Sequence, residues 1–153
     1  MSPRAACRLA TIGFTHIYDY VAGKSDWLAR GLPTEGEKAN EPRAIDFAGR
    51  DVVTCALTDR VDDVHSQIEA SPFGFALVIS DGGVLLGRLR RSALDGRGEQ
   101  AAAEVMEPGP STTRPDLAPS ELYQRLSRSD LRTAILSDPD GRLLGVVRRD
   151  DLR

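Results

Sequence analysis

The sequence contains a long-range repeat, and this repeat constrains the fold more than any other feature. The stretch "GGVLLGRLRRSAL" at residues 82–94 returns as "GRLLGVVRRDDL" at residues 141–152, with an offset of 58 residues between the copies. Seven of the twelve positions from 83 to 94 are identical at this offset. The same offset, without a gap, also pairs residues upstream: Thr54 with Thr112, Val64 with Leu122, Ile68 with Leu126 and Ala76 with Ala134. A repeat at this range indicates two copies of one structural unit.

Each copy predicts the same order of elements. A short extended segment comes first, at residues 51–57 and 109–115, and an amphipathic helix follows it. The apolar faces of the two helices are formed by Val61, Val64 and Ile68 and by Leu122 and Leu126. Two apolar strands come next, joined by "DGG" or "DPDG", which is typical of a hairpin turn. The unit closes with a helix start, "RSAL" or "RDDL"; the first copy continues into the helical stretch "EQAAAEVM", and the second is at most a stub.

These elements predict an α/β (α+β) fold in which two β-α-β-β-α repeats pack as a pseudo-symmetric pair. Neither small sheet could bury both of its faces alone, so the two units should pack together. We expect the first repeat at residues 51–100 and the second at 101–153, with its last helix truncated. Residues 36–50 are polar and contain Gly and Pro, which favours a linker.

Residues 1–35 form a separate block, which we expect to be a short helical extension. The stretch "RAACRLATIGF" predicts a helix that stops at Gly13, and "HIYDY" alternates like a strand. A second helix is predicted in "KSDWLARGLP", with Ser25 as its N-cap.

Composition excludes several classes of function. The net charge of −3 offers no general basic field, so nucleic-acid binding is unsupported, although 18 of the 20 basic residues are Arg. These arginines reflect either the codon usage of the genome or anion binding. Cys7 and Cys55 follow no metal or disulfide spacing, and His16 and His65 stand alone. No signal peptide or apolar run of membrane length is present, so we expect a cytoplasmic protein without a membrane partner.

The repeat resembles a CBS domain pair, the tandem module named after cystathionine beta-synthase. The resemblance rests on the order of elements, on the "VMEPGPST" lead-in to the second unit and on the paired strand ends. It implies two sheets with clefts between the repeats, where such modules commonly bind adenine nucleotides or S-adenosylmethionine. It also implies a homodimer, because CBS pairs commonly dimerise into a disc.

The first block resembles the C-terminal end of a rhodanese domain, in the stretch "LATIGFTHIYDYVAGKSDWLARGLP". A rhodanese carries its catalytic cysteine in a loop before the helix that begins here near Arg4. Cys7 would instead lie within that helix, and the rhodanese sheet is missing. We therefore expect a fragment without sulfurtransferase chemistry, packed on the CBS pair through Trp27.

The CBS resemblance also implies candidate ligand-binding residues. The family pattern G-h-x-[ST]-x-x-D places a hydroxyl near phosphate and a carboxylate near ribose. In the second unit Gly145, Arg148 and Asp151 occupy these positions, so Asp151 would hold ribose and Arg148 phosphate. The first unit has Gly87, Arg90 and Ala93 there, and Ala93 cannot hold a ribose. Each arginine either holds phosphate or, being bulkier than a hydroxyl residue, fills its cleft.

Three further residues are candidates for the same cleft. Thr112 and Thr113 either line it or are bonded turn residues, and Arg149 either contacts phosphate or is a solvated surface charge. Asp151 has an alternative as well, because an acidic residue at a helix start complements the helix dipole.

No catalytic arrangement stands out. "AGKS" at residues 22–25 is not a phosphate-binding loop, because Tyr18 occupies the position of its first glycine. No Ser-His-Asp, Cys-His or paired-carboxylate arrangement is visible. We expect a non-catalytic regulatory module that requires no cofactor and binds AMP, ADP, ATP or S-adenosylmethionine between its repeats. The alternative is a structural dimerisation or protein-interaction module with empty clefts, and the sequence does not identify a protein partner.

Overall fold

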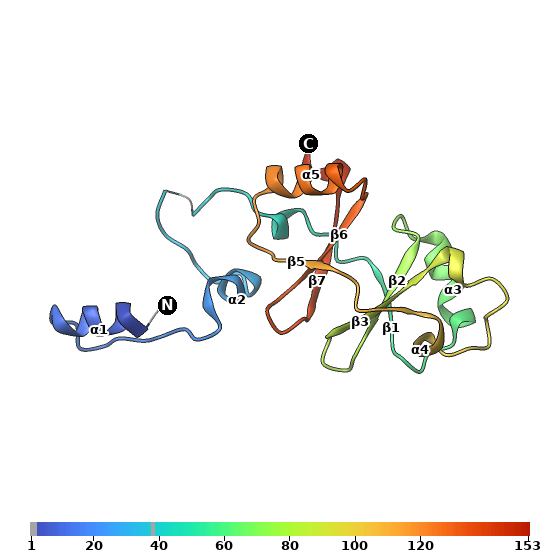
Figure 1. The fold of residues 1–153 in the computed structure, drawn as a ribbon, viewed down its shortest axis with the longest axis horizontal. Helices are drawn as coiled ribbons and strands as arrows, with labels where there is room; N and C mark the ends of the chain where they lie inside the picture. The colour runs from blue at the N-terminus through green and yellow to red at the C-terminus, as the bar shows by residue number, and fades with distance from the viewer. Residues whose placement is uncertain (1–2, 38) are drawn as a thin grey trace.

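The computed structural model describes residues 3–37 and 39–153 and shows two small sheets with helices, preceded by an N-terminal arm (Figure 1). The N-terminal part contains α1 (Pro3–Thr11), α2 (Gly23–Ala29) and the 3-10 helix η1 (Ala44–Phe47). The middle part contains β1 (Val53–Cys55), α3 (Val61–Ala70), β2 (Phe75–Ile79), β3 (Leu85–Arg90), η2 (Arg91–Ala93) and α4 (Ala102–Val105). The C-terminal part contains β4 (Glu107–Pro108), β5 (Thr112–Thr113), α5 (Pro119–Arg128), β6 (Thr133–Ser137), β7 (Leu143–Arg148) and η3 (Arg149–Leu152). No helix in the described residues is long and apolar enough to cross a membrane.

The two sheets repeat the same topology at the offset seen in the sequence. One sheet has the strand order β1-β2-β3-β4 and the other has the order β5-β6-β7. In each sheet the first strand is parallel to the second, and the second and third form an antiparallel hairpin. Phe75 pairs with Arg90 and Thr133 with Arg148, and both hairpins shift register at equivalent positions, after Val78 and after Leu136. The predicted fold class is therefore confirmed.

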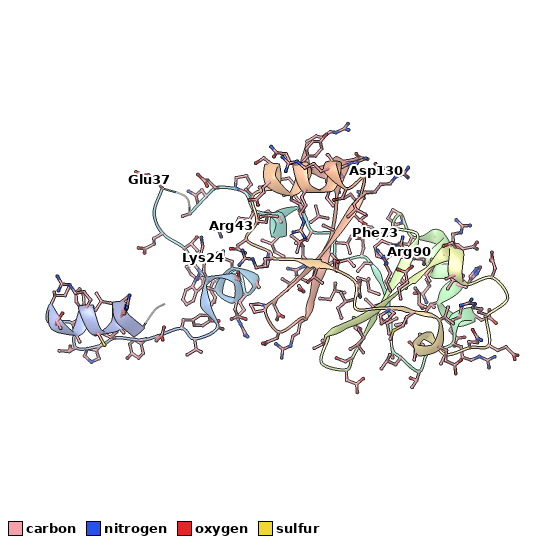
Figure 2. All side chains as sticks on the ribbon, viewed as in Figure 1. Lys24, Glu37, Arg43, Phe73, Arg90 and Asp130 are labelled. Atoms are coloured by element: carbon pink, nitrogen blue, oxygen red, sulfur yellow. The ribbon has the colours of Figure 1, made fainter. Side chains whose placement is uncertain are left out.

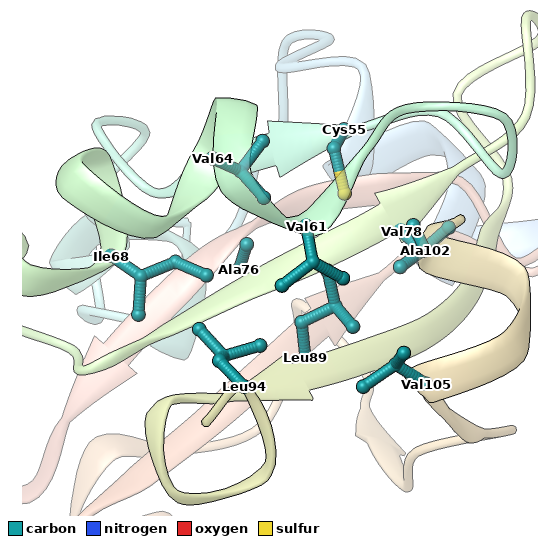
Figure 3. Close-up of a cluster of buried hydrophobic side chains, with 10 residues drawn as sticks. All are labelled: Cys55, Val61, Val64, Ile68, Ala76, Val78, Leu89, Leu94, Ala102 and Val105. Carbon is teal, nitrogen blue, oxygen red and sulfur yellow. The ribbon is translucent and has the colours of Figure 1, made fainter. Parts of the chain in front are cut away.

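Each repeat has its own small core, formed as the helix patterns predict. In α3, Val61, Val64 and Ile68 lie on one face at helical spacing and pack against β2 and β3 (Figure 3). In α5, Leu122 and Leu126 do the same over β6 and β7. All five side chains are buried. The helix expected in "EQAAAEVM" is shorter than predicted, because α4 has only four residues. The second unit ends in the short 3-10 turn η3, in agreement with the expected stub.

A third cluster of buried side chains holds the repeats together. Phe75 and Leu77 from β2 pack there against Ile135 from β6 and Val146 from β7. The tips of the two hairpins also pair, because Leu85 donates its backbone N–H to Gly141 O and Leu143 donates to Gly83 O, both at 2.9 Å. The inner faces of the two sheets thus cover each other, as small two-layer folds require.

The two repeats exchange their leading segments. Helix α4, which leads into the second repeat, packs Ala102 and Val105 into the core of the first. The turn η1, which leads into the first repeat, packs Ala44 and Phe47 into the core of the second. Ala44 and Ala102 are separated by the repeat offset, so η1 is the pseudo-symmetric equivalent of α4. The expected linker, residues 36–50, therefore contains side chains that help to build the second core.

Glycines allow these exchanged segments to approach the sheets. Gly49 forms a bridge with Val146 on β7, and Pro108 pairs with Gly87 on β3. At Gly145, whose φ is +151°, a Cβ would lie 2.7 Å from the carbonyl oxygen of Gly49. A larger residue at that position would push the leading segment away from the sheet.

The N-terminal part differs from expectation in two places. Residues 16–20, the predicted strand "HIYDY", form no strand, because they pair with no sheet edge and alternation alone does not satisfy backbone N–H and C=O groups. Ser25 lies inside α2 and is not its N-cap; the N-cap is Ala22, without a side-chain bond. Ser25 Oγ instead donates to Asp116 at 3.0 Å, which ties α2 to the second repeat. The Trp27 indole donates to Pro33 O within its own block.

A buried carboxylate organises α2. Asp26 is only 2% exposed, and it accepts hydrogen bonds from the hydroxyl of Tyr20 and from Arg30 Nε. The bond from Tyr20, followed by the bond from Arg30, lowers the pKa of Asp26. The Tyr20 ring also stacks edge-on against Trp27, with ring centroids 5.1 Å apart. These contacts give the block an internal polar cluster in place of the missing strand.

Candidate functional site

A cleft of about 480 Å³ lies between the two repeats and combines an apolar surface with arginines. From the first repeat it is lined by Phe73, Phe75, Arg88 and Arg90, and from the second by residues of β5, α5 and β6. Figure 2 labels two of the residues from the first repeat, Phe73 and Arg90, and one from the second, Asp130, which follows the end of α5. The complete set of lining residues from the second repeat is Ser111, Thr112, Thr113, Leu122, Arg125, Leu126, Asp130, Leu131, Arg132, Thr133, Ala134 and Ile135.

Two aromatic rings contribute to the apolar surface of the cleft. The centroids of Phe73 and Phe75 are 5.9 Å apart, with an angle of 44° between the ring planes. The guanidinium carbon of Arg88 lies 5.9 Å from the centroid of the Phe75 ring, within range of a cation–π contact. The cleft therefore offers a flat aromatic ligand an apolar surface with cations beside it.

Arg88 and Arg90 share one carboxylate. Arg88 Nη2 donates to Glu107 Oε2 at 2.8 Å, and Arg90 Nε donates to Glu107 Oε1 at 2.8 Å. The hydrogen bonds from Arg88 and then from Arg90 lower the pKa of Glu107. Glu107 lies on β4, which pairs with β3 beside the two arginines. The negative charge of Glu107 thus already compensates part of the positive charge of Arg88 and Arg90 in the cleft.

Arg125 and Arg132 differ from the first two arginines. Arg125 is in the last turn of α5, and Arg132 directly precedes β6. Within residues 3–37 and 39–153, neither forms an ion pair with a carboxylate. The carboxylate of Asp130, between them in sequence, lies 3.6 Å from Arg149 Nη1 and its side chain is almost fully exposed. The second repeat therefore offers two uncompensated cations to an anion.

Hydroxyl groups border the cleft at β5. Ser137 Oγ donates to Thr112 Oγ1 at 2.9 Å, which leaves the proton of the threonine hydroxyl available to another acceptor. Thr113 is half-buried beside it. Both predicted threonines thus line the cleft.

The other predicted residues lie elsewhere. Arg148, Arg149 and Asp151 are absent from the cleft lining, so the structure corrects the expectation that one cleft brings them together with the threonines. Arg148 Nε donates to Asp151 Oδ2 at 3.0 Å, and both side chains are substantially exposed. Arg149 lies close to Asp130, which does line the cleft, and its backbone N–H donates to Arg132 O. The pseudo-symmetry explains this separation, because Arg148 is the counterpart of Arg90 in the other repeat.

Sequence reasoning missed most of the cleft. Arg88 and Arg90 alternate along β3 on the face that meets the other repeat, and this alternation was a usable signal for Arg88. Phe73, Arg125 and Arg132 carried no such signal, because they come from loop and helix positions that only the packing of the repeats brings together. Glu107 was hidden within the lead-in to the second repeat, since nothing in the sequence shows that this segment pairs with β3.

A neighbouring hollow of about 620 Å³ shares Phe73, Phe75 and Arg90 with the cleft. Its other lining residues include Glu69 and Asp95, so its charge is less suited to an anionic ligand. The cleft with four arginines is the better candidate for a phosphate-containing molecule.

Comparisons with known proteins find a family match in one repeat and the same fold in CBS-pair structures. Residues 102–153 match the family model of the CBS domain. The CBS domains of a transcriptional regulator from Streptococcus pneumoniae share the fold with a TM-score of 0.64 at 18% identity, over 72% of this chain and 96% of that one. CBSX2, solved in complex with AMP, has a TM-score of 0.63 at 19% identity, over 72% and 92%. These CBS-pair structures agree with both repeats.

A further similar structure is the cytosolic domain of the Mg²⁺ channel MgtE, solved in complex with ATP. Its TM-score is 0.65 at 23% identity, and the match covers 74% of this chain. The chain spans about half of that structure, with 48% covered. No curated protein matches the sequence. None of the comparisons confirms the rhodanese-like character of the N-terminal block.

Proposed function

We propose that this chain is a non-catalytic regulatory module that binds an adenine nucleotide in the cleft between its repeats. The observation that carries the proposal is the cleft itself, where two phenylalanine rings and four arginines converge from both repeats. Such a surface suits a ligand with a flat apolar base and a phosphate. The AMP complex of CBSX2 and the ATP complex of MgtE, which share the fold, support this choice of ligand class.

The lining residues suggest how the nucleotide is held. The base lies against Phe73 and Phe75, and the phosphate is bound by Arg125 and Arg132. Thr112 and Thr113 face the ribose and the bridging oxygens with hydroxyl and backbone groups. S-adenosylmethionine carries a sulfonium cation and no phosphate, so this arginine-lined cleft favours nucleotides over it.

A ligand in this position would act by shifting a conformational equilibrium. It contacts both repeats at once, so it stabilises the arrangement in which the sheets are packed as described here. A dissociation constant in the tens of micromolar, roughly 6 kcal/mol of binding free energy, suits a sensor of metabolite levels. A protein partner that binds one of the two conformations would detect this shift.

The pair of Arg148 and Asp151 remains a second possible position for the nucleotide. Asp151 still has one carboxylate oxygen that is not bonded to Arg148, and this oxygen could accept a ribose hydroxyl. Arg149 lies beside this pair in sequence and close to Asp130 in space. A substitution at Asp151 therefore distinguishes the two locations.

Isothermal titration calorimetry with AMP, after a thermal-shift comparison of AMP, ADP, ATP and S-adenosylmethionine, tests the proposal. Arg132→Gln should weaken AMP binding about tenfold or more, because a charge-assisted phosphate contact is lost. Asp151→Ala should change it less than about twofold, and Arg97→Gln, an exposed arginine away from the cleft, is the matched control. Loss of binding in Asp151→Ala alone would move the site to the Arg148 pair. Absence of binding by any nucleotide at millimolar concentration would refute the proposal.

A structural module with empty clefts is the second candidate. It is favoured by one observation, that Arg90 and Arg148 already have carboxylate partners within the chain. In that case the chain would act as a homodimer whose assembly does not depend on a ligand. Sedimentation velocity with and without AMP separates the two candidates, because a dimer indifferent to AMP, together with no calorimetric binding, supports the structural role.

A further inference from the structure

Glu107 occupies an unusual position relative to the cleft. It lies on β4, which belongs to the lead-in of the second repeat, but β4 pairs with β3 of the first, placing Glu107 opposite Arg88. From there its carboxylate accepts hydrogen bonds from Arg88 and Arg90, two of the four arginines that line the cleft. Its position is held by the backbone, because Gly109 N–H donates to Leu86 O at 3.0 Å and continues the contact between the two segments.

The second repeat has no equivalent of this carboxylate. At the repeat offset, Glu107 corresponds to Gly49, which bridges to β7 but carries no side chain. Arg148, the counterpart of Arg90, takes its carboxylate from Asp151 instead. In the first repeat, Ala93 occupies the position that corresponds to Asp151, so no carboxylate is present there. The position of the compensating carboxylate therefore differs between the repeats, and only in the first does it come from the exchanged segment.

The charge balance of the cleft follows from this difference. Glu107 compensates part of the charge of Arg88 and Arg90, while Arg125 and Arg132 form no carboxylate ion pair within the described residues. Two uncompensated guanidinium groups match the double negative charge of a nucleoside monophosphate. A longer phosphate chain that extends toward β3 would meet Arg88 and Arg90, whose positive charge the Glu107 carboxylate already offsets, so the additional phosphates would gain little.

We infer that Glu107 determines ligand specificity, by making the cleft prefer a nucleoside monophosphate over the corresponding triphosphate. This inference rests on the proposed function, because it concerns the same cleft. Without the Glu107 charge, Arg88 and Arg90 become available to the β and γ phosphates. The preference then moves toward the triphosphate, whereas contacts to the base and the first phosphate remain unchanged.

Calorimetric titration of the full chain with AMP and ATP tests this inference in wild type and in Glu107→Gln. The ratio of the ATP and AMP dissociation constants should fall at least about fivefold in the variant, and AMP affinity should change less than about twofold. The effect should shrink as ionic strength rises, because these groups are partly exposed and salt screens them. Glu99→Gln is the matched control, since Glu99 is exposed and pairs only with Arg60, at 3.6 Å, among the described contacts.

The outcomes separate this inference from the proposed function. An unchanged ratio in a folded Glu107→Gln protein, with AMP still bound, overturns the role of Glu107 but leaves the nucleotide site in place. Absence of binding in both proteins overturns both. If Glu107→Gln binds ATP and the wild-type protein does not, the inference is supported in its strongest form. If circular dichroism shows that this variant is unfolded, Glu107→Ala replaces it, and the ratio of the ATP and AMP dissociation constants is measured in the same way. An unchanged ratio in the folded Glu107→Ala protein overturns the inference.

Discussion

Arg148 and Asp151 bond to each other through Arg148 Nε and Asp151 Oδ2, at 3.0 Å, across the closing turn of the second repeat. The family pattern implied that these two residues hold phosphate and ribose, and in the structure one oxygen of the Asp151 carboxylate is bonded to Arg148. Their counterparts behave differently, because Ala93 cannot pair with Arg90 and Glu107 does so instead. The two repeats, so similar in sequence, thus present different charges to a ligand.

The Arg148–Asp151 pair should contribute little to stability. Both side chains are exposed by more than a third, and exposed ion pairs typically contribute about 0–1 kcal/mol. We expect Asp151→Ala to change the free energy of unfolding, measured by urea denaturation, by less than about 1 kcal/mol. A loss of about 3 kcal/mol would show that the closing turn depends on this pair. Asp140→Ala is the control, because Asp140 is another exposed aspartate that pairs with an arginine, Arg142.

The core of the first repeat should be sensitive to truncation. Ile68 is fully buried in the cluster between α3 and its sheet (Figure 3). Ile68→Ala should lower the free energy of unfolding by about 2–5 kcal/mol, because it removes buried methyl groups and leaves a cavity. Val21→Ala is the control, because Val21 is 90% exposed on the N-terminal arm and its truncation should cost less than about 0.5 kcal/mol. Equal losses in urea denaturation would contradict the described core.

The two glycines of the strand motif should differ in their tolerance of alanine. At Gly145 a Cβ would lie 2.7 Å from a backbone oxygen, and φ is +151°, so Gly145→Ala should cost roughly 2–4 kcal/mol. At Gly87 the shortest contact is with Met106 Sδ, in a flexible side chain that can move, although Glu107 O is also near. We therefore expect a smaller loss for Gly87→Ala. Thermal and urea denaturation of both variants measure the difference, and the reverse order would refute this account.

The two thiols should react at different rates. Cys7 is exposed and Cys55 is buried, and burial, followed by the Asp59 charge, raises the pKa of Cys55 from 9.0 to about 11. Because the thiolate is the reactive form, a colorimetric thiol reagent at pH 8 should label one thiol quickly and the second only after denaturation. Rapid labelling of Cys55 in a Cys7→Ala protein would contradict its burial.

The same pKa predicts how stability depends on pH. The unfolded thiol ionises near pH 9 while the folded thiol stays protonated, so the unfolded state binds fewer protons above that pH. The contribution of Cys55 is therefore complete below about pH 9 and is lost as the pH rises toward 11. Urea midpoints at pH 8 and 10.5 should differ less in Cys55→Ala than in wild type.

The architecture of the repeats could be predicted from the sequence, because its signals are local or periodic. The offset of 58 residues identified the two units, the spacing of Val61, Val64 and Ile68 identified the buried face of a helix, and turn residues identified both hairpins. Alternation alone was not sufficient in "HIYDY", since a strand also needs a neighbouring edge with which to pair. The apparent linker was also misleading, because polarity does not exclude a short turn such as η1 that packs through Ala44 and Phe47.

The candidate site was decided by tertiary structure. Thr112 and Thr113 line the cleft between the repeats together with Arg88 and Arg90, whereas Arg148 and Asp151 do not line it. The sequence by itself determined two equivalent units, each with one apolar face and a motif arginine at the end of a strand. Only the packing of the two units decided which strand ends lie next to each other and which carboxylate bonds to each motif arginine. The physical reason is that periodicity specifies which side of an element is buried, whereas contacts between distant segments specify what covers it.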